Sequence, residues 1–198
     1  MVTTPRSWTT SGAGRTHLQK LVEDLGVAVP PQRFRPLRVA FSVAVVPRIR
    51  ALVDLRVGQL LYRAGLRPVA TYLQARVLRY SGADINCGAV MGPGLSLVHS
   101  PGVVVGDKVV AGANLRVFQG VTLGDRGMGE EGQPTIGDDV TIFAGALVLG
   151  PITLGDRVVV AANSLVLSDV PADHLAYGAP AVSRPLADRS SSGTTRAV

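Results

Sequence analysis

The stretch INCGAVMGPGLSLVHSPGVVVGDKVVAGANLRVFQGV, residues 85–121, carries an aliphatic side chain at every sixth position. The same period resumes further along the chain and continues to residue 166. The positions of the series are Ile85, Met91, Leu97, Val103, Val109, Leu115 and Val121, followed by Ile136, Ile142, Val148, Leu154, Val160 and Val166. A period of six matches neither an α-helix, at about 3.6 residues, nor a simple strand, at about two.

A six-residue repeat indicates a parallel β-helix, in which each hexad forms one short strand and one turn. The aliphatic residue of each hexad points into a prism, and glycines collect at the turns. An ordinary β-sandwich with aliphatic strands is the alternative, but thirteen consistent positions argue against it. We therefore predict a mainly β fold, with a small α-helical region before the repeat.

One long segment interrupts the repeat. Val121 and Ile136 are fifteen residues apart, so the spacing assigns nine extra residues to this coil. They fall within the glycine-rich loop 125–135, DRGMGEEGQPT. Because long loops on rigid scaffolds usually carry function, we expect this loop to contribute to a site.

Composition limits the classes of protein that the chain can represent. The sequence has 46% hydrophobic but only 5% aromatic residues, which suits a prism core of aliphatic side chains. The single cysteine excludes an internal disulfide framework. Residues 1–80 carry a net charge of +10 and residues 81–198 a net charge of −4. The basic part suggests an anionic partner or a solvated helical face. We expect no nucleic-acid partner, and without an apolar signal segment we expect a cytoplasmic location.

The composition divides the chain into four parts. Residues 1–15 are small and polar, so we expect them to be disordered. Residues 16–82 form the α-helical region, where Thr16 and Gln19 fit a capping box and Gly26 ends the first helix. Residues 83–183 form the β-helix, and residues 184–198 form a mobile C-terminal tail.

Residues 33–50 combine an apolar run with five arginines. The run is too short to span a bilayer, which takes about 20 residues. It is typical of a helix buried in a subunit interface, and peripheral contact with an anionic membrane surface, at the inner membrane face, is the alternative.

His99 is the candidate catalytic residue within the repeat. A single repeat histidine argues against a zinc site, which takes at least three protein ligands, so we expect no metal. Asp84 precedes His99 by fifteen residues, close to the length of one coil of three hexads. An aspartate from the adjacent coil would orient the histidine as a general base for a hydroxyl. A structural histidine in a turn is an equal alternative from spacing alone.

The sequence resembles the serine O-acetyltransferase family of hexapeptide-repeat acyltransferases over about residues 50–183. The matching segments are GADI at 82–85, VHSPGVVVG at 98–106, FQGVTLG at 118–124, PTI at 134–136 and YGAPA at 177–181. The resemblance implies a left-handed β-helix that forms a homotrimer, with acetyl-CoA between subunits. It places His99 on the catalytic base and Asp84 on its orienting carboxylate. The acetyl-CoA positions that it implies are Gly124, Ala144, Gly145, Ala162, Gly178 and Pro180.

Three positions depart from the family pattern in the region that binds the acceptor. Val98 stands where the family has Asp, and Gly132 and Gln133 stand where it has an Arg-His pair. A free amino acid would lose charged partners at these positions. We therefore predict an O-acetyltransferase with a small-molecule acceptor other than an amino acid, such as a sugar, a polysaccharide precursor or a specialised metabolite. Serine O-acetyltransferase and a non-catalytic trimeric scaffold are the alternatives. The helical region is shorter than that of the family, so the oligomeric state is open between a trimer and a dimer of trimers.

Overall fold

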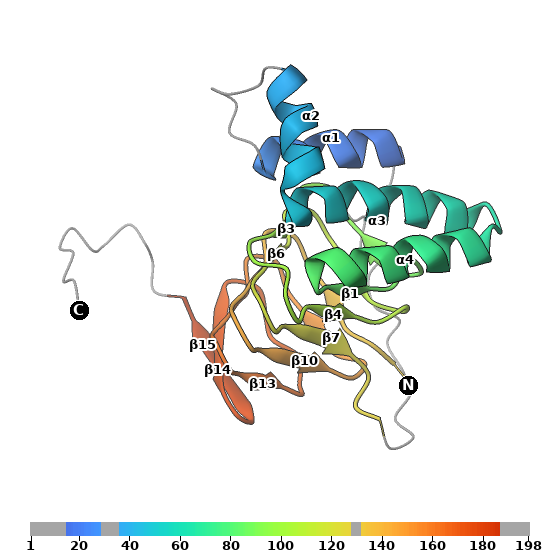
Figure 1. Cartoon of the computed structure of the whole chain (residues 1–198). Helices are drawn as coiled ribbons and strands as arrows, with labels where there is room; N and C mark the ends of the chain where they lie inside the picture. The colour runs from blue at the N-terminus through green and yellow to red at the C-terminus, as the bar shows by residue number, and fades with distance from the viewer. Residues whose placement is uncertain (1–14, 29–35, 128–131, 187–198) are drawn as a thin grey trace.

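The computed structural model describes residues 15–28, 36–127 and 132–186. Most of the predicted disordered N-terminus and most of the predicted tail lie outside these residues. Figure 1 shows the described helices gathered against one end of a prism of short strands. The helices are α1 His17–Ala28, α2 Pro36–Val45, α3 Pro47–Arg63 and α4 Arg67–Ser81.

The strands are short and form the walls of the prism. They are β1 Asp84–Ile85, β2 Val90–Met91, β3 Ser96–Leu97, β4 Val104–Val105, β5 Val110–Ala111, β6 Arg116–Val117, β7 Thr122–Gly124, β8 Thr135–Ile136, β9 Thr141–Ile142, β10 Leu147–Leu149, β11 Thr153–Leu154, β12 Val159–Val160, β13 Leu165–Val166, β14 His174–Gly178 and β15 Ala181–Pro185. In the described residues they pair into three sheets, in the orders β1-β4-β7-β10-β13, β11-β8-β5-β2 and β15-β14-β12-β9-β6-β3. Every third strand therefore stacks on the same wall, which confirms the predicted left-handed parallel β-helix.

The phase of the repeat differs from the prediction after Leu97. The next strand residue on the core side is Val105, two residues later than the period predicts. Asp84 pairs with Val104, twenty residues on, whereas Val104 pairs with Thr122, eighteen residues on. The turn between β3 and β4 therefore holds two extra residues, and it contains His99.

The predicted positions after Leu97 lie just before the strands instead of in them. These are Val103, Val109, Leu115 and Val121, and all four are buried. The strand residues are Val105, Ala111, Val117 and Leu123, which are buried too. Both positions face the prism, so an aliphatic period cannot tell one from the other. The excursion between Leu123 and Ile136 consequently holds seven extra residues and not nine.

The helical layer closes the prism end that precedes the first coil. The predicted capping box is confirmed, because the Thr16 N–H donates to Gln19 Oε1 at 2.8 Å and the Gln19 N–H donates to Thr16 Oγ1 at 3.2 Å. The predicted end of α1 at Gly26 is wrong, since the helix continues to Ala28. Gly26 lies in open space, and its φ is not in the left-handed region that ends helices.

Helix α4 leads directly into the first coil. It ends at Gly82, which adopts a left-handed φ of 71°. A Cβ at this position would lie 3.2 Å from Pro101 Cα, so glycine lets the chain pass close to the turn that carries His99. No helix in the described ranges is long and apolar enough to cross a membrane.

Candidate functional site

His99 lies at the corner of the prism where the two extra residues occur. The turn is fixed to the end of α4, because Ser100 Oγ donates to the Ser81 carbonyl at 2.9 Å and the Gly102 N–H donates to the Gly82 carbonyl at 2.8 Å. The His99 side chain is exposed, and within the described ranges its ring makes no hydrogen bond. Its ring centroid lies 6.3 Å from that of Phe118, in an edge-to-face arrangement. The backbone of the turn is thus fixed while both ring nitrogens stay available for a substrate.

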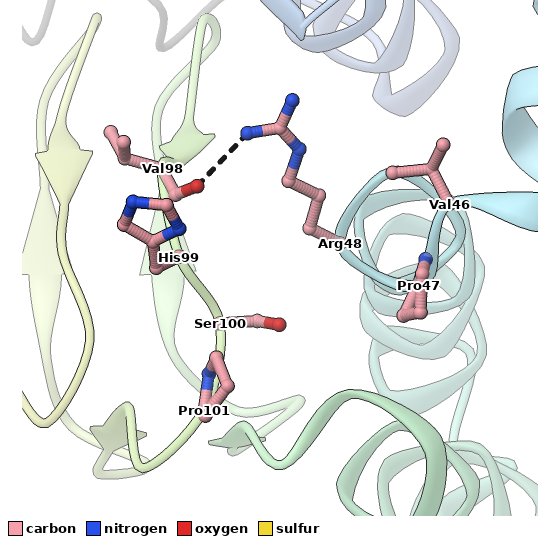
Figure 2. A pocket seen from close by; sticks show the side chains of 7 residues that line it. All are labelled: Val46, Pro47, Arg48, Val98, His99, Ser100 and Pro101. Carbon is pink, nitrogen blue, oxygen red and sulfur yellow. Dashed lines mark hydrogen bonds between the residues drawn. The ribbon is translucent and has the colours of Figure 1, made fainter.

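A cavity of about 310 Å³ opens beside His99. Its lining residues are Val46, Pro47, Arg48, Val98, His99, Ser100 and Pro101. The start of α3 forms one wall and the His99 turn forms the other (Figure 2). Arg48 reaches across and donates from Nη1 to the Val98 carbonyl at 2.9 Å. The cavity can therefore hold a small polar molecule between an imidazole and a guanidinium.

Asp84 is half-buried on β1, one coil before His99. Its Oδ1 accepts a hydrogen bond from Gln74 Nε2 of α4 at 2.8 Å. β1 pairs with β4, the strand that follows the His99 turn, so both residues belong to adjacent coils. Among the described contacts there is none between Asp84 and the His99 ring, and the orienting role of Asp84 stays a prediction.

In the coils that follow, turns stack on the His99 turn and form one corner along the prism. Phe118 and Phe143 extend it, with ring centroids 4.9 Å apart. Three of the predicted acetyl-CoA positions lie on the same corner: Ala144, Gly145 and Ala162. The Gly145 N–H donates to the Gln119 carbonyl, and the Asn163 N–H donates to the Ala144 carbonyl, both at 2.9 Å. Small residues therefore stack one above the other beside the aromatic rings.

The other predicted acetyl-CoA positions lie elsewhere. Gly124 ends β7 and pairs with Leu149, at the far edge of the wall from the His99 corner. A Cβ on Gly124 would meet no atom within 4 Å. Gly178 and Pro180 belong to the exposed hairpin of β14 and β15, where the Ala179–Pro180 peptide is cis. The structure thus brings together half of this predicted set within one chain.

The predicted acceptor positions are also separated. Val98 lines the His99 cavity, and its carbonyl accepts the hydrogen bond from Arg48. Gln133 lies at another corner of the prism, between β7 and β8, where its Oε1 accepts from the Lys108 N–H at 2.9 Å and its Nε2 donates to Asp107 Oδ1 at 3.2 Å. Gly132 packs near Pro151. Residues 132 and 133 are therefore not among the residues that line the cavity beside His99 in the same chain.

Cys87 is close to Asp84 in sequence but is unsuited to act as a nucleophile. Its side chain is buried, and its Sγ lies 3.6 Å from the Ala70 carbonyl. Burial raises the pKa of the Cys87 thiol to about 11. In the described ranges there is also no cluster of three His, Cys, Asp or Glu that could hold a metal ion.

Sequence reasoning missed Arg48 as a residue of this site. The sequence shows it only as one of five arginines around an apolar run. No spacing rule links a helix of the N-terminal region to a turn fifty residues later. The start of α3 faces the His99 turn, and Arg48 reaches from it to the Val98 carbonyl (Figure 2).

Comparison with known proteins identifies relatives of the whole described architecture. The family model "Bacterial transferase hexapeptide (six repeats)" matches residues 133–168. A serine acetyltransferase of Mycobacterium tuberculosis is 37% identical over 135 residues, which cover 68% of this chain and 59% of the relative. A serine acetyltransferase of Helicobacter pylori is 38% identical over 136 residues, which cover 68% of this chain and 80% of the relative. The chain spans 37–59% of the length of the first seven curated relatives that it matches.

Solved structures agree with these relatives. The serine acetyltransferase of Neisseria gonorrhoeae superimposes with a TM-score of 0.77 at 33% identity, covering 90% of this chain and 70% of the other. The Brucella abortus serine acetyltransferase in complex with coenzyme A superimposes with a TM-score of 0.73 at 33% identity, covering 84% of this chain and 66% of the other. The helical layer is therefore similar in these proteins as well as the prism.

Proposed function

The chain belongs to the serine acetyltransferase family of hexapeptide-repeat proteins, and from this membership we propose that it transfers an acetyl group from acetyl-CoA to the hydroxyl of L-serine. The observation that carries the proposal is the exposed His99, fixed by its backbone at the mouth of a cavity large enough for an amino acid. Relatives at 37–44% identity that cover 64–68% of this chain are serine acetyltransferases or probable serine acetyltransferases.

The prediction of an acceptor other than an amino acid is wrong. The curated relatives and the solved neighbours are serine acetyltransferases at 30–44% identity, which favours serine over a sugar or another neutral hydroxyl compound. The prediction considered positions 98, 132 and 133 alone. The cavity beside His99 is also walled by the start of α3, which brings a guanidinium that those three positions do not include.

The proposed reaction is a direct transfer. An imidazole nitrogen of His99 takes the proton of the serine hydroxyl, and the hydroxyl oxygen attacks the thioester carbonyl carbon. Backbone N–H groups stabilise the oxyanion of the tetrahedral intermediate. The C–S bond then breaks, and His99 returns the proton to the sulfur, so that the products are O-acetylserine and CoA. Asp84 on the adjacent coil is the proposed orienting carboxylate for the imidazolium.

The His99 corner offers a path for acetyl-CoA. Ala144, Gly145 and Ala162 have small side chains on consecutive turns, which leaves backbone groups accessible to a pantetheine arm. At the far edge of the wall, the open space around Gly124 leaves room for another part of the molecule. The proposed assembly is a homotrimer, in which the hairpin residues Gly178 and Pro180 help to line the site between subunits.

The helical layer bears on this assembly. Phe41 and Val45 of α2 are exposed, at 67% and 58% of their full area. A neighbouring subunit is the proposed cover for them, in keeping with the short apolar stretch at 33–50. The division of the chain into four parts, the cytoplasmic location and a membrane contact of residues 33–50 stay predictions.

The proposal is tested by measuring CoA release with a thiol reagent. The single cysteine is buried, so the protein itself contributes little background. The acceptors are L-serine, L-homoserine, glucose and a nucleotide sugar, each with acetyl-CoA, and His99→Ala is the control. Release with serine that His99→Ala loses is the expected result. Release with a sugar but not with serine contradicts it, and failure to bind CoA at all supports the scaffold alternative.

A further inference from the structure

Arg48 is the cation that faces the cavity beside His99. Among the described residues that line this cavity, Arg48 carries the only permanent charge, and there is no carboxylate. The guanidinium approaches from α3, and the His99 turn lies opposite it (Figure 2). The field in the cavity is therefore positive. A ligand group that enters beside His99 meets a cation and no competing anion.

The Arg48 guanidinium is held in place, but it uses only part of its hydrogen-bonding capacity within the described residues. Its Nη1 donates to the Val98 carbonyl at 2.9 Å, and this is its one hydrogen bond to the described residues. A guanidinium has five N–H donors, so several remain for a ligand. Arg48 also lines a second cavity of about 150 Å³ on its other side, with Val98 and Arg116. The guanidinium consequently stands between two open spaces instead of packing into the core.

The tether to Val98 fixes the distance between the guanidinium and the base. Val98 immediately precedes His99, and adjacent Cα atoms are about 3.8 Å apart. A group bound to Arg48 therefore lies at the same turn as the His99 ring, in the cavity that both residues line (Figure 2). In serine, adjacent carbons carry the hydroxyl and the carboxylate. A carboxylate on Arg48 thus leaves the hydroxyl on the side of His99.

The two positions where the resemblance expects an Arg-His pair carry no cation in this chain. Positions 132 and 133 are Gly and Gln, and the Gln133 side chain is bound to Asp107 and to the Lys108 N–H. We propose that Arg48 binds the carboxylate of the amino-acid acceptor and thereby sets the specificity of the His99 site for acceptors that carry one. This inference rests on the proposed function, because it names the group that holds the serine.

Arg48 pairs well with a carboxylate on chemical grounds. Its planar fork can give two parallel N–H···O bonds, which a lysine cannot match. A carboxylate that loses such a partner loses a charge-assisted hydrogen bond, and affinity falls by about tenfold to a hundredfold. The expected effect is therefore on the KM for serine. The KM for acetyl-CoA is expected to stay unchanged, because Arg48 is not on its proposed path along Ala144, Gly145 and Ala162.

The test compares Arg48→Gln, Arg48→Lys and Arg50→Gln with the wild-type chain in the CoA-release assay. Arg50 is the matched control, because it lies on the same helix but stacks over Tyr80, 5.2 Å from the ring centroid, away from the cavity. For Arg48→Gln we expect the KM for serine to rise by about tenfold or more, with the KM for acetyl-CoA and kcat within about twofold of wild type. Arg48→Lys recovers part of the loss, and Arg50→Gln behaves as wild type.

The contrary outcomes separate the two proposals. If the wild-type chain releases no CoA with serine, the proposed function fails and this inference fails with it. If the wild-type chain acetylates serine and Arg48→Gln leaves the KM for serine unchanged, only the role of Arg48 is overturned. A fall in kcat for Arg48→Gln with an unchanged KM for serine also overturns it, because it means that Arg48 merely holds the Val98–His99 turn.

Discussion

Arg56 of α3 and Asp24 of α1 form a buried, two-pronged ion pair. Arg56 Nε donates to Asp24 Oδ2 at 2.8 Å and Nη2 donates to Oδ1 at 3.1 Å, with side chains 2% and 0% exposed. The remaining polar capacity is also used, since Arg56 donates to the carbonyls of Met91 and Gly92 and the Leu95 N–H donates to Asp24. The pair therefore joins two helices to the first coil, below the site.

Breaking this pair is expected to destabilise the chain strongly. In Asp24→Asn the buried guanidinium keeps its charge but loses its counter-ion, and the free energy of unfolding falls by about 3–5 kcal/mol. Urea unfolding followed by circular dichroism measures the change. The exposed pair of Arg157 and Asp173 is the control, and Asp173→Asn leaves the unfolding midpoint nearly unchanged. A small loss for Asp24→Asn would show that the helical layer contributes little to stability.

Asp84→Asn tests the proposed orienting role of Asp84, which lies one coil before His99. The amide keeps a hydrogen-bonding partner for Gln74 but cannot stabilise the imidazolium that forms during transfer. We expect kcat to fall by about tenfold to a thousandfold, with little change in the KM of either substrate. Steady-state kinetics measure this, and the melting temperature checks that the fold is intact. Unchanged kcat would mean that Asp84 serves only to anchor α4 to the first coil.

The local sequence correctly predicted the features that depend on residues close together in the chain. The capping box of Thr16 and Gln19 formed as expected, because its two hydrogen bonds close within four residues. The six-residue period gave the β-helix for a similar reason, since each hexad repeats the same strand and turn. The phase error after Leu97 has a physical cause as well. Val103 and Val105 are both buried and both aliphatic, so the two-residue insertion beside His99 leaves the apolar pattern unbroken.

Contacts between elements that are far apart in the sequence could not be predicted from residue spacing. The apolar side chains of Leu18 and Val22 on α1 are 70% and 56% exposed, whereas the buried side chains of this helix are the charged Lys20 and Asp24. The partner of Asp24 lies on α3, which no spacing in the sequence reveals. The same holds for Arg48, whose place beside His99 depends on how α3 crosses the first coil. Sequence thus singled out His99 and Val98, which line one cavity, but not Arg48, which lines it from α3.

Several glycines that follow strand residues lie where successive coils approach closely, namely Gly92, Gly112, Gly137 and Gly155. At Gly137 a Cβ would lie 2.8 Å from Asp156 N and 2.9 Å from the Gly155 carbonyl carbon. The Gly155–Asp156 peptide is backbone and cannot yield cheaply, so Gly137→Ala lowers the free energy of unfolding by about 3 kcal/mol. Gly26→Ala is the control, because Gly26 lies in open space within α1 and alanine raises helix stability by up to about 1 kcal/mol. Equal midpoints for both variants in urea unfolding would contradict this.

Cys87 is expected to react slowly with thiol reagents in the folded protein. Its thiol is buried and its pKa is raised to about 11, so little thiolate is present or accessible at pH 8. We expect labelling by a disulfide reagent to be at least about a hundredfold slower than in guanidinium chloride, where the same residue serves as its own control. Cys87→Ala should keep kcat within about twofold of wild type. Loss of transfer in that variant, with the fold retained, would instead indicate an acyl-cysteine intermediate.

His17 gives the chain a pH-dependent stability. Arg63 Nη1 lies 3.1 Å from His17 Nε2, and since arginine can only donate, that nitrogen must carry a lone pair. The proton then sits on Nδ1, which is buried without a partner in the described residues. Burial first, and then the charges of Arg63, Lys20 and Arg56, lower the pKa of His17 below its ordinary value.

The sign of the effect follows from proton binding. The unfolded chain takes up a proton on His17 near pH 6.5, whereas the folded chain takes it up only at lower pH, so stability is lost as pH falls below about 6.5. His17→Gln keeps an acceptor for Arg63 but does not titrate. We therefore expect the free energy of unfolding of the wild-type chain to fall more steeply than that of the variant between about pH 7 and pH 5. Urea unfolding at each pH measures both curves. Parallel curves would show that His17 binds its proton equally in both states, and that Arg63 does not hold it neutral.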